Sequence, residues 1–337
     1  MGLLLVTLCL VFTGATQDAG DGPGHRYGHE KAPARTDGTI RVASYNVLNY
    51  FDDVDDPALS GEWDDKDLAS RPAQLKALAA AIRALDADVL ALQEIESRDA
   101  LIRFRDTYLA DMGYEHVGSL DAGYYRGVEQ SVLSRIPITG VRNWPGLSTA
   151  DVKREGGGFQ EVPADAIVEF QRSPLLVELR TDEGYEFTLV VVHLKAGGLA
   201  HAYRREAEGL KLLELVDEVL EGDPTANIIV LGDFNAKYSY KSMRLLVEGG
   251  LVDTMHHRAT EPNDADRNLW VTHESGRTLD YILMNASAYN EFVPGSAFVL
   301  GTLHPGDDYD WREDSPPPGH AADHYPVAVE IIPREGS

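Results

Sequence analysis

Apolar residues recur in two distinct patterns along this chain, and each pattern predicts a different kind of element. Short continuous runs rich in β-branched and aromatic residues are too short for typical helices and predict strands covered on both faces. These runs cover residues 40–47, 88–93, 114–117, 124–134, 175–180, 187–194, 227–231, 279–284, 297–300 and 325–332.

Other segments carry apolar residues at the three-and-four spacing of an amphipathic helix. They span residues 70–85, 99–112 and 203–220, and in the first of them Ser70 is placed to cap the helix and Pro72 lies in its first turn. Strands flanked by such helices predict two sheets packed face to face with helices outside. Because no linker-like stretch follows Gly38, we expect one domain over residues 40–335.

The N-terminal region has a different character. Leu3 to Phe12 form a ten-residue apolar run, followed by the small residues Gly14 and Ala15. A run of that length is too short to span a bilayer and predicts a signal peptide over residues 1–16, with a buried helix as the alternative. Residues 17–39 are rich in Gly, Pro, His and charge without an apolar period, which predicts a flexible leader. A secreted or periplasmic protein is expected.

The composition of the chain limits which kinds of chemistry and binding are expected. The single cysteine, Cys9, lies inside the signal segment, so disulfides, thiolate metal sites and cysteine catalysis are not expected in the mature chain. Lys and Arg total 30 against 55 Asp and Glu, a net charge of −25. This excess argues against a duplex binder that works by bulk charge, and it also suits solubility in an extracellular or salty medium.

Five predicted strands end in acidic, amide or imidazole side chains. These are Asn46, Glu94, His193, Asp233 with Asn235, and Asp323 with His324. A carboxylate just beyond an apolar run is costly to bury unless it is paired or coordinated. We therefore expect one site at a rim of the sheets, able to bind a divalent metal and cut a phosphate ester.

Glu94 and one distant Asp offer the oxygen ligands that Mg²⁺ takes, which is the favoured role of Glu94. The alternative is that Glu94 caps the next helix or pairs with Arg98. Asp233 can hold a water and Asn235 can donate to a phosphoryl oxygen if the backbone stays extended between them, and a plain Asx turn is the alternative.

Among the histidines, His193 taken alone reads as a core residue, but Lys195 would face the same side and adds a cation for phosphate. Asp323 and His324 are adjacent, so one can bind metal while the other acts as a base. Asp280 can hold the ring of His324, or instead form a salt bridge with Arg277.

Six motifs in order resemble the endonuclease/exonuclease/phosphatase superfamily. They are Ser44-Tyr45-Asn46, Leu92-Gln93-Glu94, Val192-His193-Leu194-Lys195, Gly232-Asp233-Phe234-Asn235, Leu279-Asp280-Tyr281-Ile282 and Asp323-His324-Tyr325-Pro326. The resemblance implies an α/β (α+β) four-layer sandwich of two packed mixed β-sheets flanked by helices, with a metal-dependent site at one edge.

The resemblance also implies roles. Glu94 and Asp323 would hold the metal, with Asn46 beside them, and Asp233 and Asn235 would position the attacking water and the phosphoryl oxygens.

His324, steered by Asp280, would be the general base or stabilise the charged transition state. Phosphate contacts would come from further side chains, namely His193, Tyr125, Lys195, Arg126 and Arg204.

The expected activity is that of an exported phosphodiesterase using Mg²⁺, with Mn²⁺ or Ca²⁺ as alternatives. The stretch after Asn46 resembles secreted bacterial nucleases, so DNA or RNA is the expected substrate of a monomer without a stable protein partner. The alternatives are a phosphatase or a sphingomyelinase-like phospholipid hydrolase, and a non-catalytic binding module. Apolar patches on residues 51–68 or 303–322, which contain Trp63 and Trp311, would favour lipid.

Overall fold

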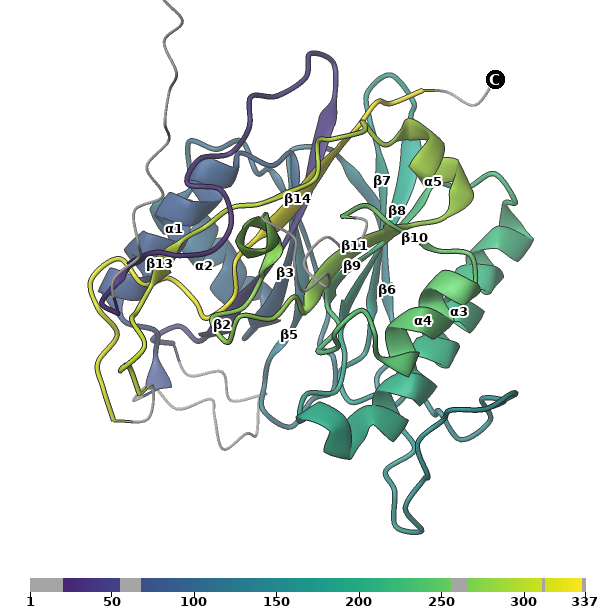
Figure 1. The fold of residues 1–337 in the computed structure, drawn as a ribbon. Helices are drawn as coiled ribbons and strands as arrows, with labels where there is room; N and C mark the ends of the chain where they lie inside the picture. Colours follow the sequence, from purple (N-terminus) through teal and green to yellow (C-terminus); the bar gives the residue numbers. More distant parts are fainter. Residues whose placement is uncertain (1–20, 55–67, 256–265, 311–312, 335–337) are drawn as a thin grey trace, which may run out of the picture.

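Two six-stranded sheets pack face to face, and helices cover their outer faces (Figure 1). This computed structural model describes residues 21–54, 68–255, 266–310 and 313–334. The predicted four-layer sandwich is confirmed. The predicted signal segment, Trp63 and Trp311 lie outside the described residues.

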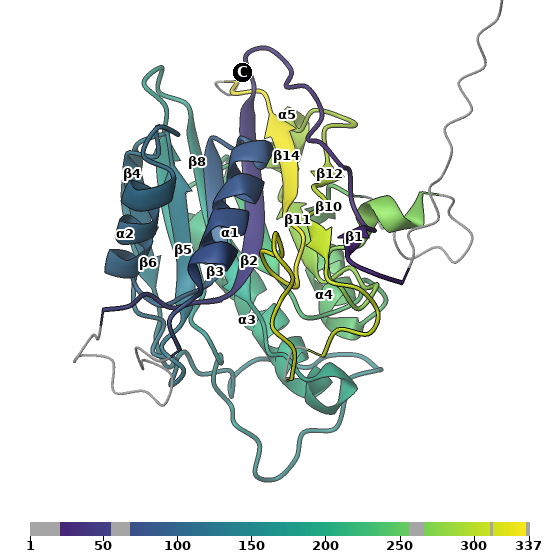
Figure 2. The ribbon, with the colours of Figure 1, turned by 90° about the vertical axis from the view of Figure 1, so that its left-hand side faces the viewer.

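The first sheet has the order β12-β14-β2-β3-β5-β4. Its strands are Phe298–Val299, Val327–Ile331, Ile40–Tyr50, Val89–Ile95, Glu129–Ser134 and His116–Ser119. Strands β2 and β3 run parallel, and the pairings with β14 and β5 are antiparallel, so the sheet is mixed. Helices α1 (Pro72–Leu85) and α2 (Arg98–Tyr108) cover its outer face (Figure 2).

The second sheet has the order β10-β11-β9-β8-β7-β6. Its strands are Val252–Asp253, Asp280–Met284, Ile228–Asp233, Glu186–His193, Leu175–Arg180 and Ile138–Asn143. Only its β8–β9 pair is parallel. Helices α3 (Ala202–Gly222) and α4 (Lys241–Glu248) lie outside it, and α5 (Ala286–Glu291) follows β11. None of the helices in the described ranges has the length and apolar character needed to cross a bilayer.

Alternation along β2 decides which side chains meet the second sheet. Val42 packs into the core between the two sheets, whereas Ala43 and Tyr45 pack with α1 residues such as Ile82. Successive side chains of a strand point to opposite faces, so Asn46 lies on the same face as Val42. The strand period therefore directs the amide of Asn46 toward the other sheet.

Several predicted boundaries were wrong. The N-cap of α1 is Arg71 without a side-chain bond, and the hydroxyl of Ser70 instead accepts from the backbone N–H of Phe51 at 3.2 Å. Strand β5 begins at Glu129 rather than residue 124, because Gly127 turns the chain with φ of 64°. Strand β6 was not predicted because Ile138–Asn143 contains no continuous apolar run. Helices α4 and α5 were not predicted because they are short.

Residues 21–39 differ from the expectation of a flexible leader. Strand β1 (Gly24–His25) pairs with β13 (Leu303–His304), and the ring of Tyr27 lies 5.9 Å from that of Tyr325. The backbone N–H of Thr36 donates to Glu330 Oε2 at 3.0 Å. Backbone pairing and one aromatic contact hold this segment, and neither leaves an apolar period in the sequence.

Candidate active site

The polar strand ends meet at one rim of the sandwich. His193 at the end of β8 is paired in register with Asp233 at the end of β9, and Asp233 is paired with Asp280 at the start of β11. Because β11 runs antiparallel to β9, its first residue lies at the rim where β9 ends. Asp323 and His324 precede β14, which likewise runs antiparallel to β2.

Two contacts across the sandwich join the sheets at this rim. In the first contact, Asn46 Nδ2 donates to Asp233 Oδ2 on the other sheet at 3.2 Å. Within its own strand, Asn46 Oδ1 accepts from the backbone N–H of Leu48 at 3.1 Å. His193 Nε2 lies 3.8 Å from Glu94 Oε1 and 3.3 Å from Asp233 Oδ2. The structure thus brings the predicted residues Asn46, Glu94, His193 and Asp233 together.

Glu94 has an unusual backbone. Its φ is 67°, the pairing of β3 with β5 shifts register around it, and Leu48 and Asn49 opposite it also have positive φ. Glu94 Oε2 accepts from the backbone N–H of Asn49 at 2.8 Å, and α2 is capped by Ser97. Left-handed non-glycine residues are costly and concentrate at functional sites. The alternatives of a helix cap or a pair with Arg98 are not seen in the described residues.

The Asp233 loop turns sharply, contrary to the extended backbone that we expected. Asn235 has φ of 48°, and its Nδ2 donates to Asp233 Oδ2 at 3.0 Å and to the carbonyl of Leu194 at 3.1 Å. Gly232 is required before it, because a Cβ there would lie 2.0 Å from the carbonyl oxygen of Val192. Both predicted side chains still face one another.

Asp280 holds His324. His324 Nδ1 lies 2.8 Å from Asp280 Oδ2, and His324 Nε2 lies 3.7 Å from Asp233 Oδ2. An ionised carboxylate only accepts, so Nδ1 carries the proton in this bond. Arg277 donates to Ser275 Oγ at 2.5 Å, so the alternative salt bridge to Asp280 is not formed.

Sequence reasoning missed His273. Its Nε2 lies 3.6 Å from Asp323 Oδ2, and its ring centroid lies 4.6 Å from that of His324. The short apolar pair before it, Trp270 and Val271, is the same signal that marked the other strand ends, but it was too short to register. This contact links Asp323 to the cluster.

Burial and neighbouring charges shift the pKa values of these groups in different directions. Burial, with Asp280 adding to it, raises the pKa of Asp233 to about 7 against the opposing effect of His324. Burial, followed by the Arg172 charge, holds the pKa of His193 well below its usual range. Burial alone would lower the pKa of His324, but the carboxylates of Asp280 and Asp233 outweigh it and hold that pKa well above its usual range.

The donor set fits a divalent cation. One ligand atom each from Asp233, Asp280 and His324 lies within 4.8 Å of the others, and so do those of His273, Asp323 and His324. Asp280 Oδ1 is buried without a hydrogen-bond partner. Carboxylate oxygens are the ligands that Mg²⁺ and Mn²⁺ take in proteins, whereas imidazole is more typical of Zn²⁺ and Fe²⁺.

The side chains predicted to contact phosphate lie less close together than the acids and histidines. Arg126 Nη2 donates to Asn49 Oδ1 at 2.8 Å, beside Glu94. Tyr125 is 68% exposed and packs its ring edge-on against Tyr124 rather than against the acids. Arg204 donates to the carbonyl of Glu169 at 3.1 Å. Their roles in phosphate binding stay predictions.

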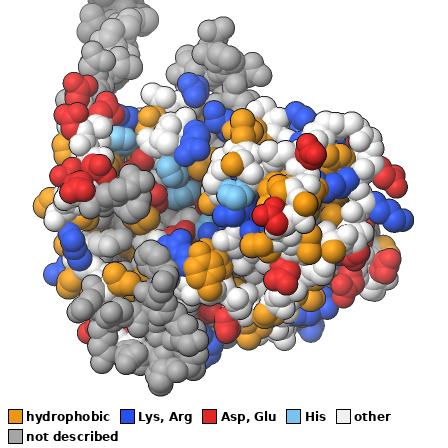
Figure 3. Space-filling view, turned by 90° about the horizontal axis from the view of Figure 1, so that it is seen from below, with side chains coloured by type: hydrophobic (Ala, Val, Ile, Leu, Met, Phe, Trp, Pro, Cys, Tyr) orange, Lys and Arg blue, Asp and Glu red, His pale blue; other side chains and the backbone are white. Residues whose placement is uncertain are grey.

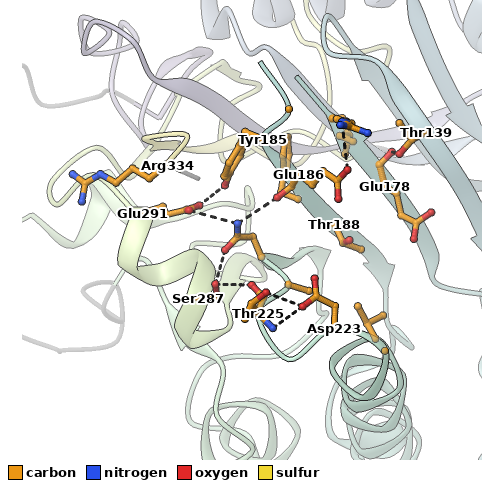
Figure 4. A pocket seen from close by; sticks show the side chains of 18 of the residues that line it. Thr139, Glu178, Tyr185, Glu186, Thr188, Asp223, Thr225, Ser287, Glu291 and Arg334 are labelled. Atoms are coloured by element: carbon orange, nitrogen blue, oxygen red, sulfur yellow. Dashed lines mark hydrogen bonds and ion pairs between the residues drawn. The ribbon is translucent and has the colours of Figure 1, made fainter. Parts of the chain in front are cut away.

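A hollow at the opposite end of the second sheet has a different character (Figure 4). It is lined by the ends of β7 and β8 and by α5, and its polar groups bond to one another, for example Tyr185 with Glu291 and Thr225 with Asp223. These side chains satisfy each other. The cluster of acids and histidines therefore remains the candidate site.

The model of the Endonuclease/Exonuclease/phosphatase family matches residues 43–296, a span that contains the motifs from Ser44 to Asp280. The chain belongs to this family. Members of the endonuclease/exonuclease/phosphatase family are phosphoric ester hydrolases, and they typically use a divalent metal. No curated protein matches the chain in sequence.

Solved structures of the same fold are similar at low identity. The catalytic domain of human Nocturnin with a bound sulfate anion is 19% identical with a TM-score of 0.57, over 88% of this chain and 95% of that one. A mannosyl-6-phosphatase from Bacteroides thetaiotaomicron is 19% identical with a TM-score of 0.53, over 87% and 99%. Truncated TDP2 from Caenorhabditis elegans is 13% identical with a TM-score of 0.51, over 87% and 97%. At these identities the likeness shows the fold.

Proposed function

We propose that this protein is an exported, divalent-metal-dependent phosphodiesterase that cleaves DNA or RNA. The observation that carries the proposal is the convergence of Glu94, Asp233 and the His324–Asp280 pair at one rim, from both sheets. Family membership supports phosphoric ester hydrolysis. Export is inferred from residues 1–16 and the acidic composition.

Glu94 and Asp323 would hold the metal. Asn46 bonds to Asp233, which shares the His193 contact with Glu94, and His273 contacts Asp323. A divalent ion bound there would polarise the phosphate and offset its charge. Side chains of the protein carry out the other steps, which are the attack of water and the stabilisation of the phosphoryl oxygens.

Asp233 and Asn235 receive the water. The amide of Asn235 is fixed on Asp233 Oδ2, so a water bonded to this carboxylate is oriented and gives up a proton to it as it attacks phosphorus. The water oxygen forms a bond to phosphorus while the P–O bond to the leaving oxygen breaks, and the leaving oxygen keeps the electron pair and takes a proton from solvent. Asp233 is 1% exposed, which keeps other water from the carboxylate.

His324 and His193 serve the phosphoryl oxygens. Asp280 fixes Nδ1 of His324, which leaves Nε2 free to donate where negative charge grows in the transition state. His193 Nε2 faces the carboxylates of Glu94 and Asp233, so it carries hydrogen and is a second donor at the same rim. Preorganised donors of this kind supply a large part of the rate enhancement.

Nucleic acid is favoured as substrate by the local charge. Basic and histidine side chains gather around the middle of the face shown in Figure 3, although the whole chain has a net charge of −25. The exposed ring of Tyr125 beside Arg126 offers a surface on which a base can stack. A strand of nucleic acid presents both the phosphates and the bases that such a surface recognises.

A phospholipid hydrolase is the second candidate. Val162, Ile167 and Val168 in the loop before β7 are 42%, 60% and 44% exposed, and Leu199 before α3 is 64% exposed. Apolar side chains exposed on loops can enter the headgroup region of a membrane. Sphingomyelin is therefore one of the substrates to be tested.

The test is an assay of the purified chain without residues 1–16, stripped with a chelator and supplied with Mg²⁺, Mn²⁺ or Ca²⁺. Substrates are plasmid DNA, RNA, sphingomyelin and bis(p-nitrophenyl) phosphate. We expect metal-dependent cleavage of a nucleic acid that Asp233→Asn abolishes, while Asp182→Asn at the exposed far end retains it. Full activity of Asp233→Asn would contradict the assignment, and preferential cleavage of sphingomyelin would select the second candidate.

A further inference from the structure

Three basic side chains beside His193 form what we call the basic cluster: Arg172, Lys195 and Arg204. Arg172 is 3% exposed and Arg204 is 8% exposed, and Lys195 is half-buried. The Nε atoms of both arginines are buried without a hydrogen-bond partner. Buried polar groups without partners are uncommon in native proteins and call for an explanation.

The charges of the basic cluster are balanced less completely than those of nearby cations. Within the residues that the structure describes, none of its three side chains forms a salt bridge. Nearby cations do so, since Arg154 lies 3.4 Å from Glu206 and Lys211 lies 2.8 Å from Asp151. In a chain with 55 acidic residues, three unpaired buried or half-buried cations in one place are unexpected.

The position at the start of α3 makes the charge still less favourable. The first turn of α3 contains Arg204 and no acidic residue. The N-terminus of a helix carries a partial positive charge, so cations there are destabilising. Stability of the fold does not account for this arrangement, whereas binding of an anion does.

Glu208 holds the cluster in place through the backbone and forms no salt bridge with it, although the charges of Arg204 and Arg172 act on its buried carboxylate. Its two carboxylate oxygens accept from the backbone N–H groups of Lys195 at 2.8 Å and Gln171 at 3.1 Å. It therefore fixes the two loops that carry Lys195 and Arg172. Arg172 Nη1 donates to the carbonyl oxygens of His193 and Leu194. Arg204 Nη2 donates to the carbonyl oxygen of Glu169. The acceptors of these bonds are neutral carbonyls, so the positive charge is left for an anion.

The basic cluster adjoins the catalytic residues. Arg172 Nη1 lies 3.3 Å from the carbonyl oxygen of His193, and Arg172 Cζ lies 4.8 Å from the ring centroid of Tyr124. Tyr124 in turn supports the exposed Tyr125, with ring centroids 4.7 Å apart. The cluster thus extends from the catalytic rim to an exposed aromatic surface.

We propose that the basic cluster binds a second, uncleaved phosphate next to the one that is hydrolysed, while a neighbouring base lies against Tyr125. The substrate is then a single-stranded nucleic acid, read through two adjacent phosphates. This inference rests on the proposed phosphodiesterase activity and adds the substrate requirement. Burial, Arg172 and Arg204 lower the pKa of Lys195, which agrees with crowded positive charge awaiting an anion.

The test uses thymidine trinucleotides in which one linkage is a phosphate and the other a neutral, uncleavable methylphosphonate, made in both orders. The all-phosphate trinucleotide is the reference. For the wild-type protein we expect kcat/KM for the intact linkage to fall at least about tenfold when the neutral linkage occupies the cluster, since charged hydrogen bonds are lost. Only one of the two orders is expected to show the effect.

Lys195→Gln and Arg204→Gln provide the matching protein changes. In each variant we expect the penalty of the neutral linkage to shrink toward onefold, because the charge it removes no longer has its partner. Arg180→Gln, an exposed arginine at the opposite rim, should keep the wild-type penalty. Thermal unfolding of each variant shows whether the fold is intact, and Lys195, the more exposed residue, serves if Arg204→Gln does not fold.

The outcomes separate the two proposals. No cleavage of any trinucleotide by the wild-type protein, with any of the metals, would contradict the phosphodiesterase proposal. Cleavage with equal kcat/KM for the charged and neutral flanking linkages would overturn the basic cluster alone. An unchanged penalty in both variants would also overturn it.

Discussion

The amide of Asn46, on one sheet, donates to the carboxylate of Asp233, on the other, over 3.2 Å. Each sheet supplies one partner of this bond. The carboxylate of Asp233 is therefore correctly placed only when the two sheets are correctly packed. Asn46→Ala removes this bond, and the carboxylate of Asp233 then keeps the two bonds from Asn235, which lie within its own sheet. We expect kcat to fall by about 10- to 100-fold, as for other residues that orient a catalytic group, in steady-state assays. Asn143→Ala, on an edge strand, is the control.

Asp280→Asn tests the orientation of His324. An amide oxygen in place of the carboxylate accepts less strongly from Nδ1–H, and the amide nitrogen favours the wrong tautomer. A loss in kcat on the order of a thousandfold is expected, by analogy with other carboxylate–histidine pairs. Chemical shifts of the ring nitrogens should show the changed tautomer. A variant with normal kcat would mean that His324 needs no such partner.

His273→Asn tests the residue that the sequence did not reveal. His273 Nδ1 accepts from the backbone N–H of Ser275 at 3.0 Å, so Nε2 carries the hydrogen that faces Asp323. Without it Asp323 is less ordered, and we expect the affinity for Mn²⁺ to drop about tenfold by electron paramagnetic resonance titration. His116→Asn, at the start of β4, should bind Mn²⁺ as the wild type does. Equal affinity in both variants would remove His273 from the site.

Glu94→Gly separates stability from function. Glycine adopts a φ of 67° without strain, so in chelator the variant should be more stable by about 1 kcal/mol in denaturant unfolding. Metal-dependent cleavage should be lost, because the carboxylate is gone. A less stable variant would show that the bond from Asn49 to Glu94 outweighs the strain.

Glu129 predicts how stability depends on pH. Burial raises its pKa from 4.5 to about 8. The folded protein then keeps a proton that the unfolded chain releases, so stability is highest below pH 4.5 and is lost as pH rises toward 8. Glu129→Gln should remove this decline, which is on the order of 5 kcal/mol, since one pKa unit corresponds to about 1.4 kcal/mol. Denaturant midpoints across pH give the measurement, with Glu115→Gln, exposed near the same sheet, as the control.

The sequence predicted the rim because strand ends leave a strong local signal. Glu94, Asp233 and Asp280 each stand out as a carboxylate bordering an apolar run, and a parallel pair of strands brings such ends together. His273 and Arg172 lie outside long strands, so nothing periodic marks them. Their proximity to Asp323 and His193 depends on how the loops close.

The backbone at the site was the least predictable part. Glu94 and Asn235 adopt left-handed backbone conformations, which residues other than glycine rarely adopt. The sequence therefore did not indicate these conformations or the side-chain positions that they set. The N-terminal segment was misjudged for a related reason. Residues such as Thr36 are held by partners nearly three hundred positions away, on Glu330, which no local pattern shows.

The left-handed Glu94 has a consequence for anyone who engineers this protein. Methods that choose residues to suit a given backbone would replace Glu94 with glycine or asparagine and count the change as an improvement. A more stable protein obtained in this way would lose the carboxylate that we propose as a metal ligand. Thermostabilisation should therefore leave this position untouched and look instead to the edge strands and the exposed faces of α1 and α3.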